Sequence, residues 1–203
     1  MFSLRLSNST KNYQNYRWFF TSNNVLVVGG KNDEQNEFAL KNFLMPKYTI
    51  MHTSKPGSPF MIILSDNPTK KDLDETAVFC ACFSKQWKES KPLNKIDIDV
   101  FKGEQIYKLK TMKLGTFGIK GNKNTIKVKP ELVLIIQNGK FRAVPKINGK
   151  RKEQILAEIN PGVLSKEQAT EKIVKQLRNK YHFPVSKEEI MQAIPSDNIN
   201  LKF

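Results

Sequence analysis

Apolar and polar positions in the first ninety residues follow two periods, one typical of strands and one typical of helices. Short apolar runs predict strands at residues 17–21, 24–28, 48–52 and 60–64. Between these runs, apolar side chains recur every three or four residues over 33–44 and over 69–84, which predicts two helices. Asn32 or Asp33 is placed to cap the first helix, and Thr69 together with Asp72 is placed to cap the second.

The second half of the chain begins with strand-like segments and ends with helix-like ones. Six segments have the composition of strands, at 96–100, 105–109, 116–119, 125–128, 132–137 and 140–144. Asn138 and Gly139 form a two-residue turn signal that predicts a hairpin from the last two. Ser165 and Ser186 each begin a capping pattern, so we expect a pair of C-terminal helices.

Together these elements predict an α+β fold with a mixed, largely antiparallel sheet, two flanking helices and a C-terminal helical appendage. A chain of 203 residues suits one domain, or one domain with a small addition. Residues 1–15 are polar, and we expect a loose leader there. We expect the main domain at 16–148 and the helical appendage at 149–203.

Charge changes this picture, because the chain is strongly basic in one stretch. The formal net charge is +15, and residues 102–152 hold 14 Lys and Arg but only Glu104 and Glu131 as acids. One region of one sign favours an anionic partner such as nucleic acid over a merely solvated surface. Lysines alternate with apolar residues in the predicted strands, so one face should be basic. The lysines expected to contact phosphates are Lys108, Lys110, Lys113, Lys120, Lys123, Lys127 and Lys129.

Several classes of protein are disfavoured by the remaining composition. Cys80 and Cys82 are one residue apart and are the only cysteines, so a disulfide framework is excluded, and we place both in the core of the second predicted helix. With His52 and His182 distant in sequence, they make a poor zinc site, and we expect no metal, no cofactor and no catalytic residues. The sequence contains no apolar run long enough to span a membrane and no signal-peptide pattern near residue 1. We therefore expect a cytoplasmic protein that does not bind membranes.

Two loops carry candidate binding residues. Gly29, Gly30 and Lys31 lie between a predicted strand and a predicted helix, where free amides and a lysine could hold a phosphate. A tight strand-to-helix turn explains the glycines equally well. In the second loop, His52, Lys55 and Ser58 could contact a phosphate or a base, and His52 could also be a structural histidine.

Aromatic residues near the start of the chain are the third candidate. Trp18 next to Arg17 could stack on RNA bases, although an aromatic residue in a strand is more often part of the core. We include both residues in the expected binding site.

The order of these motifs resembles the RNA-binding domain of the NFACT family, called NFACT-R. The residues that carry the resemblance are 16–19, 26–33 and 35–37, then His52 with 56–58, and then 114–117, 119–121 and 123–124. The resemblance extends over about residues 16–145. It implies an RNA-binding domain like those of proteins that act on stalled ribosomal subunits, here in a standalone form. One position departs from the family pattern: Tyr48 stands where an acid often precedes the motif histidine.

The residues and the resemblance together predict a non-catalytic RNA-binding protein. We expect it to bind tRNA or rRNA on or near the ribosome, with a role in ribosome-associated quality control as the resemblance implies. Two alternatives stay open: an adaptor that binds a ribosomal or RNA-processing protein through the C-terminal helices, and an enzyme acting on RNA with His52 as a base. The sequence leaves the oligomeric state open.

Overall fold

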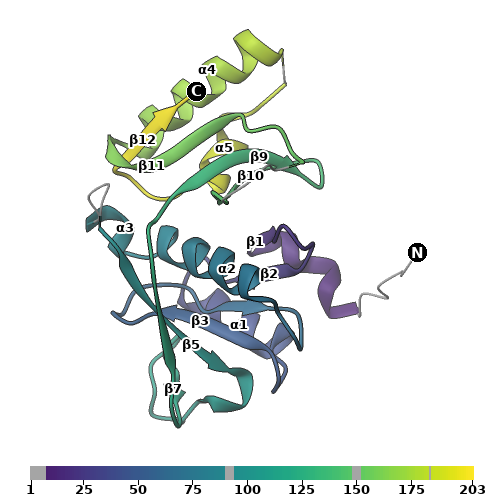
Figure 1. The fold of residues 1–203 in the computed structure, drawn as a ribbon, viewed down its shortest axis with the longest axis vertical. Helices are drawn as coiled ribbons and strands as arrows, with labels where there is room; N and C mark the ends of the chain where they lie inside the picture. The colour runs from purple at the N-terminus through teal and green to yellow at the C-terminus, as the bar shows by residue number, and fades with distance from the viewer. Residues whose placement is uncertain (1–7, 90–93, 148–151, 183) are drawn as a thin grey trace.

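The computed structural model describes residues 8–89, 94–147, 152–182 and 184–203. Two antiparallel sheets lie one above the other, and helix α2 (Lys70–Cys82) lies between them (Figure 1). The α+β class expected from the sequence is confirmed. A single apolar cluster runs from the first sheet through α2 to the second sheet and its helices.

The first sheet contains six strands in the order β1-β2-β4-β3-β5-β8. Their bounds are β1 Arg17–Phe20, β2 Leu26–Gly29, β3 Thr49–Thr53, β4 Met61–Ile63, β5 Ile96–Lys102 and β8 Asn124–Val128. Every neighbouring pair is antiparallel, where the sequence predicts a mixed, largely antiparallel sheet. Side chains alternate between the two faces: Phe19 and Val27 face the cluster with α2, whereas Trp18 and Val28 face the cluster with α1.

The helices of the first unit begin where their capping residues predict. Helix α1 (Asp33–Phe43) follows Asn32, whose side chain accepts a hydrogen bond from the Gln35 amide. Helix α2 follows Thr69, which forms a complete capping box with Asp72. Cys80 and Cys82 are free thiols buried in α2, as expected. A short helix α3 (Gln86–Glu89), which the sequence analysis missed, follows α2.

The strands after β5 divide between two places. A small hairpin of β6 (Ile106–Tyr107) and β7 (Gly118–Ile119) stands beside the first sheet, after a 3-10 helix η2 (Gly103–Gln105). The hairpin of β9 (Leu132–Gln137) and β10 (Lys140–Pro145) belongs instead to the second sheet. It turns at Asn138 and Gly139, which both have positive φ, as the two-residue turn signal predicts.

The expected C-terminal helices are present, but they pack on a second sheet that the sequence did not predict. Strands β11 (Ala157–Leu164) and β12 (Ile199–Lys202) complete the order β10-β9-β11-β12. The two expected helices, α4 (Lys166–Tyr181) and α5 (Lys187–Ala193), pack on this sheet, and α4 lies along the top of Figure 1. The sheets therefore separate between Val128 and Leu132. The boundary expected at 148 falls between β10 and β11, which both pair with β9 of the same sheet.

The expected loose leader also differs from the structure where it is described. Asn8–Asn15 form a 3-10 helix, η1. Tyr13 is buried there and packs edge-on against Trp18, with 5.1 Å between ring centroids. Residues 1–7 lie outside the described part of the chain.

Polar bonds also join the two units. The Gln137 side chain accepts a hydrogen bond from the Phe20 amide at 2.8 Å and donates one to the Phe20 carbonyl at 3.0 Å. Arg142 of β10 donates two hydrogen bonds to the Trp18 carbonyl, at 2.7 and 3.1 Å. These hydrogen bonds connect the edge strand β1 of the first sheet to the second sheet.

Candidate nucleic-acid interface

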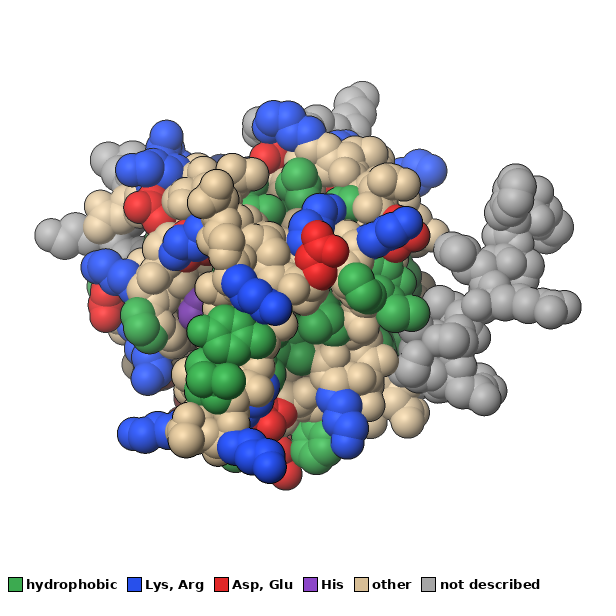
Figure 2. Space-filling model, turned by 90° about the horizontal axis from the view of Figure 1, so that it is seen from below, with side chains coloured by type: hydrophobic (Ala, Val, Ile, Leu, Met, Phe, Trp, Pro, Cys, Tyr) green, Lys and Arg blue, Asp and Glu red, His purple; other side chains and the backbone are tan. Residues whose placement is uncertain are grey.

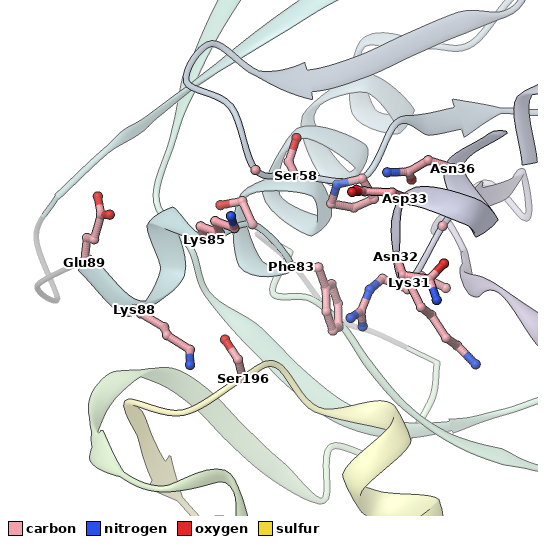
Figure 3. A pocket seen from close by; sticks show the side chains of 15 residues that line it. Lys31, Asn32, Asp33, Asn36, Ser58, Phe83, Lys85, Lys88, Glu89 and Ser196 are labelled. Carbon is pink, nitrogen blue, oxygen red and sulfur yellow. The ribbon is translucent and has the colours of Figure 1, made fainter. Parts of the chain in front are cut away.

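A hollow of about 620 Å³ opens at the junction between the two units (Figure 3). It is bordered by the first residue of β1, the turn from β2 into α1, the loop before β4, the end of α2 with α3, and the segment before β12. The charged and polar side chains that line it are Arg17, Lys31, Asn32, Asp33, Asn36, Ser58, Ser84, Lys85, Lys88, Glu89 and Ser196. The structure therefore brings together Arg17, Lys31 and Ser58 from the predicted site.

Arg17 lies along one wall of this hollow, with its guanidinium carbon 4.5 Å from the centroid of the Phe83 ring. Burial lowers the pKa of Arg17 to about 10, so the side chain still carries its charge at pH 7. Among the described residues, no carboxylate forms an ion pair with it. A planar cation held over an aromatic ring is prepared for binding phosphate or a base.

The glycine turn before α1 serves packing first. A Cβ atom on Gly30 would lie 2.4 Å from Oδ1 of Asn36, so only glycine lets the helix approach this closely. The Lys31 amide is already bound to Oε1 of Gln35 at 3.1 Å, so that amide is not free for a phosphate. The Lys31 side chain is exposed, and its pKa is lowered by burial and by the charges of Arg142 and Arg17. The motif can thus offer a ligand the Lys31 side chain, whereas the Lys31 amide is already hydrogen-bonded.

Asn36 was part of the resembling motif but was not among the expected binding residues. Its side chain is only 6% exposed, and Oδ1 has no hydrogen-bond partner among the described residues. A buried polar atom without a partner is uncommon, and here it lies in the lining of the hollow. The sequence signal that could have found it is its position one turn after the Gly30 turn.

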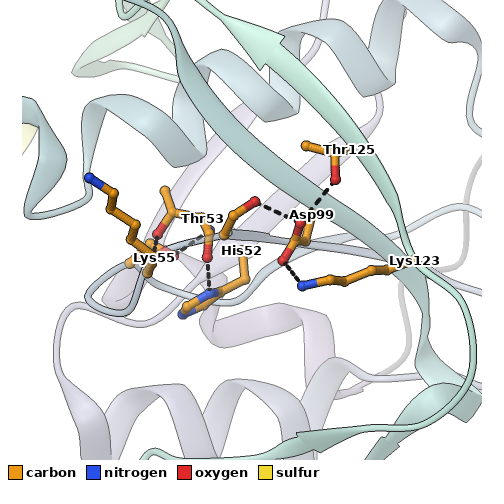
Figure 4. Close-up of polar contacts among 8 residues, drawn as sticks. His52, Thr53, Lys55, Asp99, Lys123 and Thr125 are labelled. Atoms are coloured by element: carbon orange, nitrogen blue, oxygen red, sulfur yellow. Dashed lines mark hydrogen bonds and ion pairs between the residues drawn. The ribbon is translucent and has the colours of Figure 1, made fainter.

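The second loop places its three candidates separately (Figure 4). Ser58 is buried, and its Oγ accepts a hydrogen bond from the Thr53 amide at 2.9 Å. His52 lies outside the hollow; its Nδ1 is 2.7 Å from the Thr53 carbonyl and its ring is stacked 4.6 Å from Phe60. Lys55 is exposed and extends away from His52. Ser58 and His52 therefore hold the loop in shape, and only Lys55 is free to reach a ligand.

No catalytic arrangement is visible around His52 among the described residues. Burial lowers the pKa of His52, which keeps the ring neutral at pH 7. The nearby Asp99 carboxylate is bound by Lys123, Ser54 and Thr125 instead. Burial raises the pKa of Cys80 to about 12, so that thiol is no nucleophile. In the same residues, no group of three His, Cys, Asp or Glu side chains is placed to hold a metal ion.

The lysines expected to form one basic face are partly neutralised by acids that are distant in sequence. Lys123 pairs with Asp99 at 2.5 Å, Lys108 pairs with Glu37, and Lys127 lies 3.7 Å from Asp97. The remaining lysines of that set are exposed without an ion pair in the described residues: Lys110, Lys113, Lys120 and Lys129. Seen from below, the molecule shows basic side chains interspersed with acidic and apolar ones (Figure 2).

Two further residues, an aromatic and a basic one, are buried in the structure. Trp18 is 1% exposed and lies in the core beneath α1, so its ring is not available to stack on a base, and that expectation is wrong. Arg142, the arginine of the basic segment in β10, is buried against this ring, 4.6 Å from its centroid. The basic segment is therefore divided between the two sheets and does not form one surface.

Residues 15–121 match the family described as NFACT protein RNA binding domain, which is more than half of the chain. This chain belongs to that family. The resemblance inferred from the motifs is confirmed. The matched region contains strands β1 to β7 and ends before β8 and the second sheet, so Arg17, Lys31, Asn36 and Phe83 lie inside it.

Three curated relatives are similar over parts of their length. The chain is 30% identical over 80 residues to the human ribosome quality control complex subunit NEMF, covering 37% of this chain and 7% of that protein. It is 29% identical over 121 residues to the Drosophila melanogaster NEMF homolog, covering 55% of this chain and 12% of that protein. It is 26% identical over 200 residues to the archaeal Rqc2 homolog aRqcH of Methanocaldococcus jannaschii, covering 94% of this chain and 29% of that protein. The chain spans less than a third of each relative.

A solved structure supports the fold. The C-terminal part of the fibronectin/fibrinogen-binding protein of Streptococcus suis has a TM-score of 0.51 and 20% sequence identity, over 57% of this chain and 45% of that one. In the described part of this chain, no helix is both long enough and apolar enough to cross a membrane.

Proposed function

We propose that this chain binds RNA of the translation machinery, either tRNA or rRNA on or near the ribosome, without catalysing a reaction. The relatives named for ribosome quality control support a place in that process. The observation that carries the proposal is Arg17, a largely buried arginine on Phe83 that has no carboxylate partner in the described structure. An arginine held in this way serves recognition of phosphate or bases better than it serves stability.

The exposed lysines without ion pairs supply the less specific part of binding. Lys110, Lys113, Lys120 and Lys129 are free to contact phosphates, whereas Lys108 and Lys123 would first have to leave their acids. Each lysine that neutralises a phosphate releases a counterion, so binding should weaken steeply as salt increases. His52 and Ser58 would act indirectly, by shaping the loop that carries Lys55.

Binding of the purified protein to tRNA, rRNA fragments and duplex DNA across a salt series tests the proposal. We expect a steep salt dependence and a preference for one RNA. The double variant Lys120→Glu, Lys129→Glu should lower the salt slope by roughly one to two units, because each contact contributes about 0.7–0.9. Lys175→Glu on the exposed side of α4 is the matched control. Equal binding of both variants would remove the lysine surface from the proposal, and weak binding of all three nucleic acids would contradict it.

The alternative of an adaptor acting through the C-terminal helices is less well supported. The apolar side of α4 is already covered: Ala169, Ile173 and Leu177 are buried in the core of the second unit. A helix whose apolar side is covered has little left to offer a partner protein.

A further inference from the structure

Four basic side chains from four different segments meet where the two units join. Arg17 begins β1, Lys31 lies in the turn before α1, Arg142 lies in β10, and Lys166 is the first residue of α4. Arg142 is fixed beside Arg17 by its bonds to the carbonyl of the next residue, Trp18. Arg17 and Lys31 both line the hollow, and the backbone of Lys166 is bound to Asp197, the residue after Ser196 of the same lining. Burial lowers the pKa of Lys31 and of Lys166, and neighbouring charges lower both further: Arg142 and Arg17 act on Lys31, and Arg17 acts on Lys166.

This cluster is neutralised only in part from within the described chain, because the charge of Asp197 favours the protonated form of Lys166. None of the four side chains forms an ion pair with a described carboxylate. The nearest candidate, Asp197, accepts a hydrogen bond from the Lys166 backbone amide at 2.9 Å and pairs with Lys88 at 3.0 Å. Of the acids lining the hollow, Glu89 is at the opposite end from Lys31 and Asp33 lies near Ser58 (Figure 3).

Like charges in a partly desolvated place repel one another and destabilise the fold. Such a cluster is expected where a bound anion compensates the charge. A phosphate group suits it, because a guanidinium and two ammonium groups offer several charge-assisted hydrogen bonds to its oxygens.

We propose that the corner of the hollow between Arg17, Lys31 and Lys166 binds a phosphate group of the RNA, with Arg142 adding charge from behind. The inference rests on the RNA binding proposed above and names its central contact. The unpartnered Oδ1 of Asn36 in the same hollow accepts rather than donates, so it suits a ribose hydroxyl or a base amino group. A nucleotide carries both the phosphate and such a donor.

The site gives the second unit a part in binding. Lys166 and Ser196 lie outside the region matched by the family, yet Ser196 lines the hollow and the Lys166 amide is bound to the neighbouring Asp197. The site is therefore complete only when both sheets are present.

Binding and stability of Arg17→Met and Lys166→Met test the site. Both substitutions keep a long apolar side chain and remove one charge. We expect each to weaken binding of the preferred RNA roughly ten-fold and to lower the salt slope by about one unit. Each variant should melt at the same temperature as the wild type or higher, because repulsion is relieved. Lys175→Met, an exposed residue of the same helix, should change neither property. Should Arg17→Met fail to fold, Lys166→Met and Arg17→Lys still test the phosphate site. We expect Arg17→Lys to retain most of the RNA binding, because it keeps the charge.

Two outcomes would overturn the inference in distinguishable ways. If Arg17→Met and Lys166→Met bind as tightly as the wild type while the wild type keeps its steep salt slope, RNA binding stands and this site falls. If the wild type binds no RNA, the proposed function falls as well. The melting temperature in sodium phosphate, compared with that in sodium chloride of equal ionic strength, shows whether the cluster binds free phosphate. A shift that disappears in Arg17→Met, with unchanged RNA binding, would mean that the cluster holds free phosphate rather than RNA.

Discussion

The protonation of His52 should make the stability of the protein depend on pH near neutrality. Burial against Phe60 lowers the pKa of His52 below its ordinary value of 6.5, although Asp99 nearby acts in the opposite direction. The unfolded chain therefore takes up the proton first as pH falls through about 6.5, and the folded state loses stability. We expect the free energy of unfolding in urea to decrease from pH 7.5 to 5.5, and to decrease less in His52→Gln.

The other histidine provides the control for this prediction. His182 is exposed and caps the end of α4 with positive φ, a conformation that Asn tolerates. His182→Asn should therefore keep the wild-type pH dependence. The same slope in His52→Gln as in the wild type would show that His52 does not carry the effect.

Single side chains show why the binding residues were predictable only in part. The sequence places Trp18 and Phe19 on opposite faces of a strand, and it predicts that one face is apolar. Both faces of the first sheet are covered by helices, so neither ring reaches the solvent. Likewise, the pairing of Lys108 with Glu37 joins residues 71 positions apart, which periodicity does not reveal. Arg17 and Lys31, whose binding role stays a prediction, both line the hollow because the sequence places them correctly, at the start of a strand and in a turn.

The capping box of α2 also connects this helix to the first hairpin. Thr69 Oγ1 accepts a hydrogen bond from Asn23 Nδ2 at 2.9 Å, and Asp72, only 1% exposed, accepts one from Thr21 Oγ1 at 2.6 Å. Thr69→Ala should lower the free energy of unfolding by about 1–2 kcal/mol, because the cap and this connection are lost together. Lys71→Ala, an exposed neighbour in the first turn, should change it by less than about 0.5 kcal/mol. Urea titration of both variants checks this, and equal stabilities would contradict it.

Helices were easier to predict than the last two strands because their ends carry specific signals. Asn32, Thr69, Ser165 and Ser186 each cap the helix that the sequence assigns to them. Strand β11 contains Asn160, Pro161 and Gly162, which usually indicate a turn, and its pairing with β12 shifts register between Pro161 and Leu164. Strand β12 has four residues, too few to show alternation. Tertiary pairing, not local pattern, determines both strands.

The arrangement of two sheets around α2 follows from contacts that no local pattern specifies. The hairpin of β9 and β10 was correctly predicted, but the sequence does not say which sheet it joins. It joins the second because Ala157, Glu158 and Ile159 of β11 pair with β9. Deleting residues 150–203 would therefore remove half of the second sheet and uncover the hairpin of β9 and β10, and point variants are the better probes of the second unit.

The shared core predicts that the two units unfold together. One apolar cluster extends from Phe19 in the first sheet to Ile173 in α4, and α2 contacts strands of both sheets. The two tryptophans, Trp18 in β1 and Trp87 in α3, both lie at this junction and can report on it. The Trp87 indole donates a hydrogen bond to the Asp197 carbonyl at 3.0 Å, and the Trp18 carbonyl is bound by Arg142. Loss of either unit should thus change both environments.

Urea unfolding of Trp18→Phe and Trp87→Phe, each leaving one emitter, tests this cooperativity. Within each variant, the fluorescence midpoint should coincide with the midpoint from far-UV circular dichroism, because a single transition exposes the whole core. A fluorescence change of Trp87 that precedes the loss of secondary structure would instead show the second unit separating first. In that case the proposed phosphate site at the junction would open before the protein unfolds. RNA should then raise the midpoint of this first step alone, since a ligand stabilises only the state that binds it.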